Sequence, residues 1–406
     1  MGRSIAHSYH ERTALKTARR SFTMPAKDRS TDFHIQPSTE FAQRAMTSIV
    51  NGNREKAKLA LIIPAYNEEA VLEHTVSSAV AAGLPRKHIY IVDDYSSDTT
   101  TAIAKRIVGD FNLLRVGRSG KGGAIYKVSN MLKLTKRYEW VHIADADGSF
   151  DADYFPELFK HLDTKHAAAT GYVASLPGGP ISQYRAFEYT LGMDLVRRFQ
   201  AIAGVITIIP GPTSIFRSDV FEQLEFASRT LCEDFDITLQ VHRKKLGSIQ
   251  FIPTAVTRTQ DPATLHDFIK QITRWNRGVM QMLIKHRIGL RPGKVDAYLS
   301  YQVMQNLSFF LMYTLWIPFI TIVSGSFAYM AMVFLLDVAL IFGLLMFVVL
   351  RSGRRDLLAA FPAVYAMRFI ALGVFIKCFF EVMIMRRFLA TSGTWERVAR
   401  RAQITV

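Results

Sequence analysis

Cysteine is scarce in this sequence. Only two of its 406 residues are cysteines, and neither Cys232 nor Cys378 belongs to a Cys-x-x-Cys pair. The sequence therefore gives no support to a disulfide framework, a zinc site or a thiol-redox centre. Free thiols of this kind fit a chain that faces a reducing cytosol.

Acidic residues are few compared with basic ones. The chain has 50 Lys and Arg against 34 Asp and Glu, which gives a net charge of +16. Such a surplus suits a nucleic acid, an anionic lipid surface or an anionic substrate. The sequence has no nucleic-acid-binding motif with interleaved aromatic residues, so we expect no specific nucleic-acid partner. An anionic membrane surface is the simpler explanation, because the last quarter of the chain is strongly apolar.

An apolar run is missing from the start of the chain. Residues 1–56 are polar and basic, show no sustained periodicity, and lack the apolar segment of a signal peptide. We expect a basic arm, disordered or bound to a surface, for which a solvated tail is the simplest role.

Beyond residue 56, short apolar runs alternate with helical patterns. The runs predicted as strands are Leu59–Pro64, His88–Val92, Leu113–Val116 and Val141–Ala144. Helices are predicted between them, the first of which opens at the capping residue Asn67. Strands that alternate with helices predict βαβ units, and hence an α/β fold with a mostly parallel sheet and helices on both faces.

Two carboxylates follow the fourth of these runs at a spacing of two. In an extended strand, Asp145 and Asp147 would point the same way, toward a ligand at the strand's carboxyl end. Carboxylate oxygens there suit Mg²⁺ or Mn²⁺, which commonly keep substrate phosphates in their coordination shell. The same letters recur at Asp151 and Asp153 without a preceding strand, and Asp153 is better explained as a helix N-cap. We therefore expect a metal and a phosphorylated substrate at the first pair.

A glycine-rich loop, Gly117–Gly123, precedes that strand and carries Lys121. It lacks the spacing of a P-loop and the Gly-x-Gly-x-x-Gly pattern, so a plain turn is a fair explanation. Asp93 and Asp94 end the second predicted strand at the same edge of the sheet. A lysine on a loop near that edge could still pair with a diphosphate.

Two further clusters lie beyond residue 230. Glu233 and Asp234 open a predicted helix, where carboxylates are more often partners of the helix dipole than catalysts. In the amphipathic helix predicted from residue 262, Gln271, Arg274 and Trp275 are neighbours at i, i+3 and i+4. Core packing, a solvated edge or anchoring at a membrane interface would explain these three residues without catalysis.

The C-terminal region is apolar enough to cross a membrane. Val303–Val323 has no charge, and Phe327–Leu350 is interrupted only by Asp337, which is a functional candidate or a partner within the helix bundle. Basic residues around Arg351 favour a cytoplasmic loop. The segment Leu357–Met385 holds three charged residues, and we expect an interfacial or re-entrant element there rather than a third full span.

Five motifs, in this order, resemble those of the processive, membrane-embedded family 2 glycosyltransferases, the group of cellulose, chitin, hyaluronan and poly-N-acetylglucosamine synthases. The motifs are Ile63–Glu68, Val92–Asp94, Asp145–Asp147, Glu233–Asp234 and Gln271–Trp275. Each is weak alone, but their order and separation over about residues 59 to 280, with apolar segments after them, make the likeness specific. The arm before residue 57 is not covered. Unlike many relatives, the chain is expected to have no transmembrane helix before the catalytic domain.

The resemblance implies a GT-A-type, Rossmann-like fold that binds a nucleotide-diphosphate sugar, with a UDP-sugar expected, and Mg²⁺ or Mn²⁺. The residues implied in nucleotide-sugar binding are Pro64, Ala65, Tyr66, Asn67, Glu68, Asp93, Asp94, Lys121 and Asp145, with Asp93 and Asp94 at the base or ribose. The residues implied at the metal are Asp145 and Asp147. The residues implied in catalysis are Asp234, as the base that takes the acceptor's proton, with Glu233, Gln271, Arg274 and Trp275.

The implied activity is inverting, metal-dependent transfer to a growing polysaccharide at the membrane, with export as a further expectation. A single transfer to a lipid, as in ceramide glucosyltransferases, is the nearest alternative, since those enzymes share a Gln/Arg-x-x-Arg-Trp motif. A non-catalytic membrane scaffold that binds a nucleotide-sugar is a more distant one. Cys232, where Thr is usual, and Gln260, where Glu is often found, weaken the inference about the acceptor more than that about the reaction.

The expected organisation has five parts. They are a basic arm (1–56), a GT-A catalytic domain (57–261), an amphipathic interfacial helix region (262–296), a membrane domain of two or three transmembrane helices (297–390) and a basic cytoplasmic tail (391–406). We expect a multi-pass protein of the plasma or inner membrane with a cytoplasmic catalytic domain. The expected partners are the sugar donor, a polysaccharide or lipid acceptor and membrane lipids, and a homo-oligomer is left open.

Overall fold

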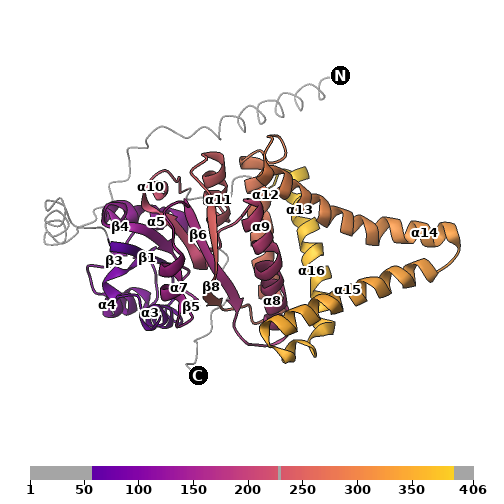
Figure 1. The fold of residues 1–406 in the computed structure, drawn as a ribbon, viewed down its shortest axis with the longest axis horizontal. Helices are drawn as coiled ribbons and strands as arrows, with labels where there is room; N and C mark the ends of the chain where they lie inside the picture. Colours follow the sequence, from indigo (N-terminus) through magenta and orange to yellow (C-terminus); the bar gives the residue numbers. More distant parts are fainter. Residues whose placement is uncertain (1–56, 227–229, 388–406) are drawn as a thin grey trace, which may run out of the picture. The chain divides into compact units, whose positions relative to one another are not determined.

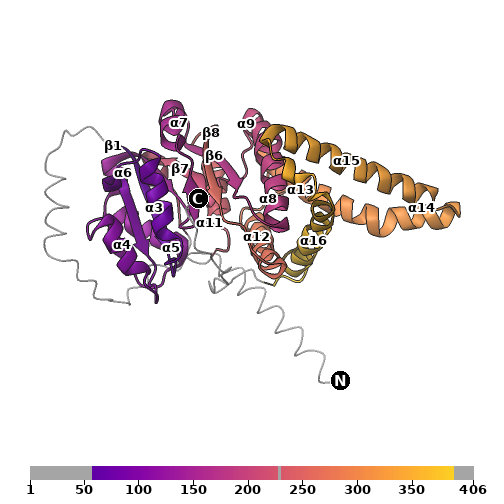
Figure 2. The same cartoon turned by 90° about the horizontal axis from the view of Figure 1, so that it is seen from below.

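The computed structural model describes residues 57–226 and 230–387, all within one compact unit (Figure 1). The basic arm expected over residues 1–56 and the tail expected over 391–406 lie outside the described residues. In the described part, a sheet with its flanking helices comes first, and a set of helices drawn in orange and yellow follows (Figure 2).

One sheet of eight strands organises the described residues, in the order β3-β2-β1-β4-β7-β6-β8-β5. The strands are β1 (Ala57–Ala65), β2 (Ile89–Asp93), β3 (Leu113–Arg115), β4 (Tyr138–Ile143), β5 (Gly148–Phe150), β6 (Ala168–Ser175), β7 (Ser214–Arg217) and β8 (Ile249–Thr259). The neighbours β3, β2, β1 and β4 pair in parallel, and so do β6 and β8. In contrast, β7 runs antiparallel to β4 and β6, and β5 runs antiparallel to β8. The predicted α/β fold with a mostly parallel sheet is confirmed.

The central strand β1 is buried on both of its faces, as its continuous apolar run predicts. Its Leu59, Leu61 and Ile63 belong to one core cluster with residues of three helices. These helices are α3 (Leu72–Ala81), α4 (Thr100–Val108) and α7 (Tyr154–His161). The alternate residues Ala60 and Ile62 point to the other face, where α5 (Gly120–Met131) contacts β1. Helices therefore cover both faces of the sheet.

The register of the parallel strands brings their carboxyl ends to one edge of the sheet. Ala65 of β1 lies opposite Asp93 of β2, and Ile62 of β1 lies opposite Ile143 of β4. The loops that follow β1, β2 and β4 therefore leave the sheet side by side, where open α/β sheets bind their ligands.

Two helices begin at residues other than the predicted ones. Asn67 has a left-handed φ of 51°, and its side-chain oxygen accepts a hydrogen bond from the backbone N–H of Ser97 at 2.8 Å. Asn67 therefore shapes a turn, and α3 starts only at Leu72. Helix α5 begins at Gly120, inside the glycine-rich segment, so Lys121 lies in the first helical turn rather than on a loop.

A continuous helical stretch crosses from the sheet to the C-terminal helices. It consists of α8 (Pro180–Leu191), a π-helical turn (Gly192–Arg197) and α9 (Arg198–Ala203). Helix α8 contacts two C-terminal helices, α15 (Ala328–Ser352) and α16 (Phe361–Phe379). Three shorter elements complete this part of the chain: α6 (Leu134–Arg137), α10 (Ser218–Phe221) and α11 (Glu233–Arg243).

A long amphipathic helix, α12 (Leu265–Lys285), follows β8. It starts after Thr264, whose hydroxyl accepts a hydrogen bond from the backbone N–H of Asp267 at 3.1 Å. Its buried Phe268 and Ile272 pack in one apolar cluster with side chains of α15 and α16. One face of α12 therefore ties the sheet-bearing part to the C-terminal helices.

The C-terminal helices are α13 (Lys294–Leu311), which runs through a π-helical turn into α14 (Ile317–Ser324), then α15 (Ala328–Ser352) and α16 (Phe361–Phe379). Two helices of the described part, Lys294–Ser324 and Ala328–Ser352, are long and apolar enough to cross a membrane. Figure 1 shows α14 and α15 extending together away from the sheet. Helix α16 packs against α12 and α8 instead.

The carboxylate of Asp337 on α15 has partners on the neighbouring helix. It accepts a hydrogen bond from the Tyr365 hydroxyl of α16 at 2.7 Å and forms an ion pair with Arg368. The pairing within the helix bundle, which the sequence left as one of two explanations, is therefore present.

Candidate active site

A cavity of about 430 Å³ lies at the carboxyl edge of the sheet. Its walls are formed by the loops after β1, β2 and β4, the first turns of α5 and α11, and one face of α12. The stretch from α8 through its π-helical turn and the segment around Gly211 also line it. The predicted site residues that line it are Pro64, Ala65, Tyr66, Glu68, Asp94, Lys121, Asp145, Asp147, Glu233, Asp234, Gln271, Arg274 and Trp275. The fold thus gathers residues from five separate motifs around a space of the size that holds a small-molecule ligand.

Two predicted residues, Asn67 and Asp93, do not line this cavity. Asp93 is fully buried, and its two carboxylate oxygens accept hydrogen bonds from the Ser96 N–H at 2.9 Å and the Thr101 hydroxyl at 2.5 Å. Asn67 is likewise bonded to Ser97 of the same loop. The polar groups of Asn67 and Asp93 thus shape the loop between β2 and α4, and their contact with the nucleotide stays a prediction.

Asp94 lines the cavity and also holds the start of α5. Its carboxylate accepts hydrogen bonds from the backbone N–H groups of Ser119 at 2.6 Å and Gly120 at 2.9 Å. A carboxylate in this place satisfies donors that the helix itself leaves unpaired. Nearby in the sequence, Arg118 stacks on Tyr66, with its guanidinium carbon 3.3 Å from the ring centre. Arg118 is a cavity-lining residue that sequence reasoning missed, although it lies within the glycine-rich segment that drew attention to Lys121.

Lys121 bridges two of the predicted acids. Its Nζ lies 2.6 Å from a carboxylate oxygen of Asp145 and 2.5 Å from one of Glu233. Burial alone would lower the pKa of Lys121, but Asp145, Glu233 and Asp234 outweigh it and hold that pKa above its usual range. The cavity wall therefore carries a charged ammonium group that could meet an anionic ligand.

Gly211 leaves the space that this bridge needs. A Cβ atom at Gly211 would lie 2.6 Å from a carboxylate oxygen of Asp145 and 2.9 Å from Nζ of Lys121. Any side chain there would displace the Lys121–Asp145 pair. Nothing in the local sequence shows which atoms Gly211 approaches.

Asp145 and Asp147 both line the cavity, from the turn between β4 and β5 rather than from a strand. The second pair, Asp151 and Asp153, does not line the cavity. Asp151 forms an ion pair with Arg258 at 2.7 Å, and Asp153 occupies the N-cap position of α7 without a side-chain cap hydrogen bond. The prediction that no strand precedes the second pair is wrong, because β5 ends at Phe150, directly before Asp151. The expected cap hydrogen bond is also not made, and only the first pair lines the cavity.

The oxygen donors of Asp145 and Asp147 fit a hard divalent ion such as Mg²⁺ or Mn²⁺. Across residues 57–226 and 230–387, no group of three or more His, Cys, Asp or Glu side chains is arranged to hold a metal by itself. A site with two carboxylates needs further oxygens from a ligand. Such a site suits ions that keep substrate phosphates and waters in their shell.

Glu233 and Asp234 lie in the first turn of α11, at the cavity wall. The backbone N–H of Phe235 donates to a carboxylate oxygen of Asp234 at 2.8 Å. Burial, and then the charge of Glu233, raises the pKa of Asp234 to about 6, although Lys121 opposes this rise. A carboxylate with such a pKa is ionised at neutral pH and accepts a proton more readily than an ordinary aspartate, as a general base must.

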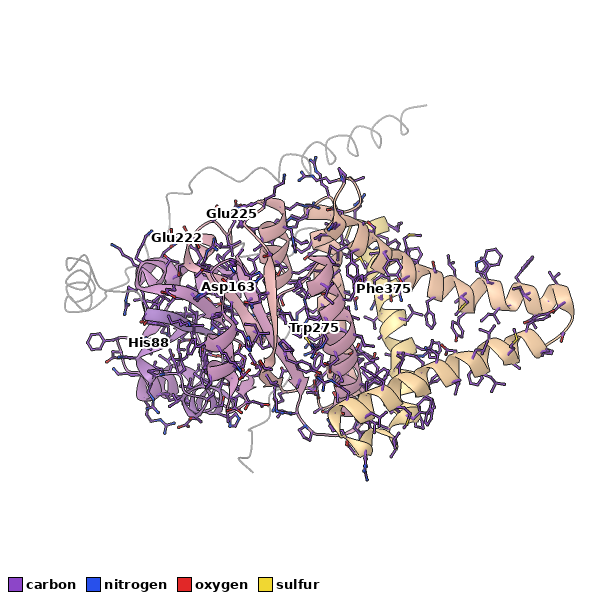
Figure 3. The ribbon with its side chains drawn as sticks, viewed as in Figure 1. His88, Asp163, Glu222, Glu225, Trp275 and Phe375 are labelled. Atoms are coloured by element: carbon purple, nitrogen blue, oxygen red, sulfur yellow. The ribbon has the colours of Figure 1, made fainter. Side chains whose placement is uncertain are left out.

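Gln271, Arg274 and Trp275 reach the cavity from α12. Arg274 donates to the carbonyl oxygen of Leu231, just before α11, at 3.4 Å. Figure 3 labels Trp275, which lies between the sheet and the C-terminal helices. The i, i+3, i+4 spacing predicted that these residues are neighbours, and the structure places all three at the cavity.

Arg185 of α8 fixes two of these side chains, and sequence reasoning missed it. It is only 2% exposed, and its guanidinium donates to Gln271 Oε1 at 2.7 Å and to Glu188 at 2.6 Å. The same guanidinium stacks on Trp275, with 4.8 Å between its carbon and the ring. Because Arg185 lies far from Gln271 in the sequence and in no motif, no local signal could have found it.

Cys232 and Gly278 mark a close approach of α11 to α12. A Cβ atom at Gly278 would lie 2.3 Å from the Cys232 sulfur, so only glycine fits there. Burial raises the pKa of the Cys232 thiol well above its usual range, so the thiol remains protonated. Cys232 is therefore a packing residue between the two helices that carry the predicted catalytic groups.

The chain is similar in sequence to known proteins. The family model described as glycosyltransferase like family 2 matches residues 57–278. The poly-beta-1,6-N-acetyl-D-glucosamine synthases of Staphylococcus aureus (strain COL) and Staphylococcus epidermidis are 27% and 26% identical to the chain over 232 residues. Each alignment covers 56% of this chain and 56% of the relative, so the chain spans about half the length of the relatives it matches.

A solved structure shares the fold. It is the mannosyltransferase PcManGT from Pyrobaculum calidifontis, determined in complex with GDP-Man and Mn²⁺. The match has a TM-score of 0.53 and 15% identity, and covers 86% of this chain and 95% of that chain. The GT-A-type fold is thereby confirmed, and since the family model covers more than half of the sequence, the chain belongs to glycosyltransferase family 2.

Proposed function

We propose that the protein transfers a hexose from a nucleotide-diphosphate sugar, with UDP as the expected nucleotide, to a growing polysaccharide at a membrane. One observation carries this proposal: Asp234, Arg274 and the pair Asp145 and Asp147 line the same cavity. These groups supply a base, a cation and a metal site, which together suffice for glycosyl transfer. The polymer as acceptor is suggested by the name of the relatives, which are poly-N-acetylglucosamine synthases.

The donor would lie along the carboxyl edge of the sheet. Asp94, Tyr66 and Arg118 line the part of the wall built by the loops after β1 and β2 and by the start of α5, and they are our candidates for contacts to the nucleotide. Lys121 and Arg274 would face the diphosphate. A guanidinium can hold a phosphate through two parallel hydrogen bonds, whereas an ammonium acts as a compact charge.

In the transfer step, an acceptor hydroxyl oxygen attacks the anomeric carbon of the donor sugar and forms the new glycosidic bond. The bond from that carbon to the diphosphate breaks, and its electrons leave with the nucleotide. Asp234 takes the hydroxyl proton. Because a single base acts on the face opposite the leaving group, the configuration at the anomeric carbon is inverted.

Asp147, with Asp145, would hold Mg²⁺ or Mn²⁺. The ion would supply charge neutralisation for the departing diphosphate, so that no protein acid is needed on that side. Lys121 has a second task in this proposal. It keeps Glu233 paired, which leaves Asp234 as the free base of the two adjacent carboxylates.

The two candidate spans support a place at a membrane. Arg351 lies in the last turn of the second span, and Arg354 and Arg355 follow it. These basic side chains favour the cytoplasmic side for the loop and for the catalytic part attached to it. Coupling of synthesis to export across the membrane, and assembly of several copies, belong to the same proposal and await a functional test.

Transfer of one sugar to a lipid is the second candidate function. It is favoured by the apolar side chains Leu195, Phe199 and Ile202, which are exposed on the helical stretch that also contributes to the cavity wall. A lipid acceptor could approach the cavity along such a surface.

A donor screen tests the proposal. The full chain in detergent or membranes is incubated with labelled UDP-sugars in the presence of Mg²⁺ or Mn²⁺, and both the released UDP and the product size are measured. Long products together with UDP release would support polymerisation. Transfer of one sugar per lipid would support the second candidate function instead of polymerisation. The absence of UDP release with every donor would refute the proposed transfer activity.

A further inference from the structure

Arg197 is a buried cation at the cavity for which the sugar-transfer chemistry above has no use. It ends the π-helical turn, is only 6% exposed and lines the cavity. Its guanidinium donates to the carbonyl oxygen of Ile208. In the part of the chain that the structure describes, no carboxylate pairs with it.

Other arginines of low exposure have acidic partners. Arg185 pairs with Glu188, Arg243 with Asp296 at 2.6 Å, and Arg277 with Glu381 at 2.9 Å. A buried guanidinium without a counter-ion is costly, because desolvation is not offset by a nearby charge. Burial lowers the pKa of Arg197 to about 10, so the group is still charged at neutral pH. Its position therefore indicates a ligand anion that supplies the missing charge.

The surroundings of Arg197 are apolar. Met193, one helical turn before it, and Ile208 both line the cavity, as does Val279. Val279 lies one turn beyond Trp275 on α12, and Ile208, Trp275 and Val279 pack against the same buried apolar cluster. The cavity thus extends beyond the predicted catalytic residues into a region with apolar walls and one cation.

The outer face of the same helical stretch is also apolar. Leu195, Phe199 and Ile202 follow at i, i+4 and i+7 and so share one face, with Phe199 56% and Ile202 89% exposed. The ring of Phe199 lies 6.1 Å from that of Tyr298 on α13, at the start of the first candidate span. An apolar surface that continues into a membrane helix therefore lies on the opposite side of the helix from the buried cation.

We infer that Arg197 binds the phosphate of an amphiphilic acceptor, a lipid-linked saccharide whose apolar chain lies against Met193, Ile208 and Val279 on the apolar wall of the cavity. This inference rests on the proposed function and names its acceptor. The guanidinium holds the phosphate that joins lipid and sugar, while a hydroxyl of the sugar faces Asp234. The transfer step and its atoms are unchanged, since the phosphate is held and does not react.

A matched set of ligands tests this assignment. Binding to the full chain in detergent is measured for a short-chain prenyl phosphate, for the uncharged prenol of the same chain, and for inorganic phosphate. We expect the prenyl phosphate to bind at least about tenfold more tightly than either control, as a charge-assisted hydrogen bond to a buried cation implies. Equal binding of the prenol, or equal binding of inorganic phosphate, would overturn the lipid-phosphate assignment.

Three variants test whether Arg197 causes this preference. In Arg197→Met the preference for the prenyl phosphate over the prenol falls about ten- to a hundredfold, whereas Arg198→Met keeps it. Arg198 is the matched control, because it is the adjacent arginine, is partly exposed and pairs with Asp194 at 3.3 Å. Arg197→Lys keeps the charge but loses the paired N–H donors of the guanidinium, and it should retain part of the preference. An unchanged preference in Arg197→Met would contradict the inference.

Separate measurements test the folding of the variants and the proposed function. The melting temperature of Arg197→Met should not fall, since an uncompensated buried charge has been removed. If that variant does not fold, Arg197→Lys decides, because equal binding by Arg197→Lys and wild type would contradict the need for a guanidinium. UDP release by the wild type in membranes, where acceptors are present, reports on the enzyme, so its absence with every donor refutes the proposed function. The binding preference is measured without a donor and still tests Arg197.

Discussion

The ammonium nitrogen of Lys121 lies 2.5 Å from a carboxylate oxygen of Glu233. The two residues come from the first turns of α5 and α11, and their contact joins the proposed donor side of the cavity to the proposed base. Removal of this cation would leave two adjacent carboxylates, the buried Glu233 and the half-buried Asp234, without their common partner. The electrostatic balance at Asp234 therefore depends on a residue from another element.

Lys121→Met should move the acid limb of the pH–rate profile to higher pH. In the wild type, activity falls as Asp234 is protonated below about pH 6, and Lys121 lowers that pKa. Without the ammonium, Asp234 binds its proton more tightly, so the loss of activity begins at a higher pH. The measurement is kcat/KM for UDP release from pH 5 to 9. An acid limb that stays in place or moves to lower pH would contradict the assigned base.

Asp147→Asn should weaken metal binding. The variant keeps the shape of the side chain and loses the anionic oxygen that a hard divalent ion prefers. We expect a roughly 10- to 100-fold higher metal concentration for half-maximal activity, in the range found when metal sites lose a supporting group. This concentration is measured by removing metal with a chelator and then titrating Mn²⁺ back. Asp153→Asn, outside the cavity, is the control and should titrate like the wild type.

Arg185 and Gln271 should be coupled in catalysis. In a double-mutant cycle of Arg185→Met and Gln271→Ala, we expect a coupling free energy of about 1–3 kcal/mol in kcat/KM, because Arg185 acts through the residue it positions. The hydrogen bond of 2.7 Å between them is the structural basis. Strictly additive losses would show that Arg185 serves only folding, and Arg198→Met provides the baseline for an unrelated arginine.

Asp337 and Arg368 should stabilise the helix bundle only as a pair. Asp337→Leu leaves a guanidinium without its partner between α15 and α16 and should cost about 3–5 kcal/mol of unfolding free energy. The double variant Asp337→Leu and Arg368→Met should recover most of that loss, since two apolar side chains replace the pair. Thermal unfolding in detergent compares the three proteins. A double variant as unstable as the single one would point to a role beyond pairing.

The sequence predicted the strands that end at the cavity because their apolar runs are local and continuous. It predicted the position of Asp145 and Asp147 for the same reason, since the acids directly follow the β4 strand. Adjacent aspartates at the end of a strand look alike in a sequence, and only the folded chain shows that Asp94 lines the cavity whereas Asp93 does not.

Other features depend on contacts between distant segments. Strand β8 contains Pro253, which normally argues against a strand interior, and its register against β6 shifts between Gly171 and Tyr172. A Cβ atom at Gly171 would lie 2.5 Å from the Ala255 carbonyl oxygen, so this irregularity requires glycine. Arg185 and Arg197 were missed for the same reason. Only the folded chain shows that Arg185 donates to Gln271 and that Arg197 lines the cavity without a carboxylate partner among the described residues.

The central claim is that Asp234 takes the proton of the acceptor hydroxyl. The most direct measurement compares UDP release and UDP binding in the wild type and in Asp234→Asn, which keeps the oxygen that accepts from the Phe235 N–H. We predict that turnover falls roughly 100- to 10,000-fold, as loss of a general base implies, while UDP affinity changes less than about twofold. Turnover close to that of the wild type in Asp234→Asn would contradict the account.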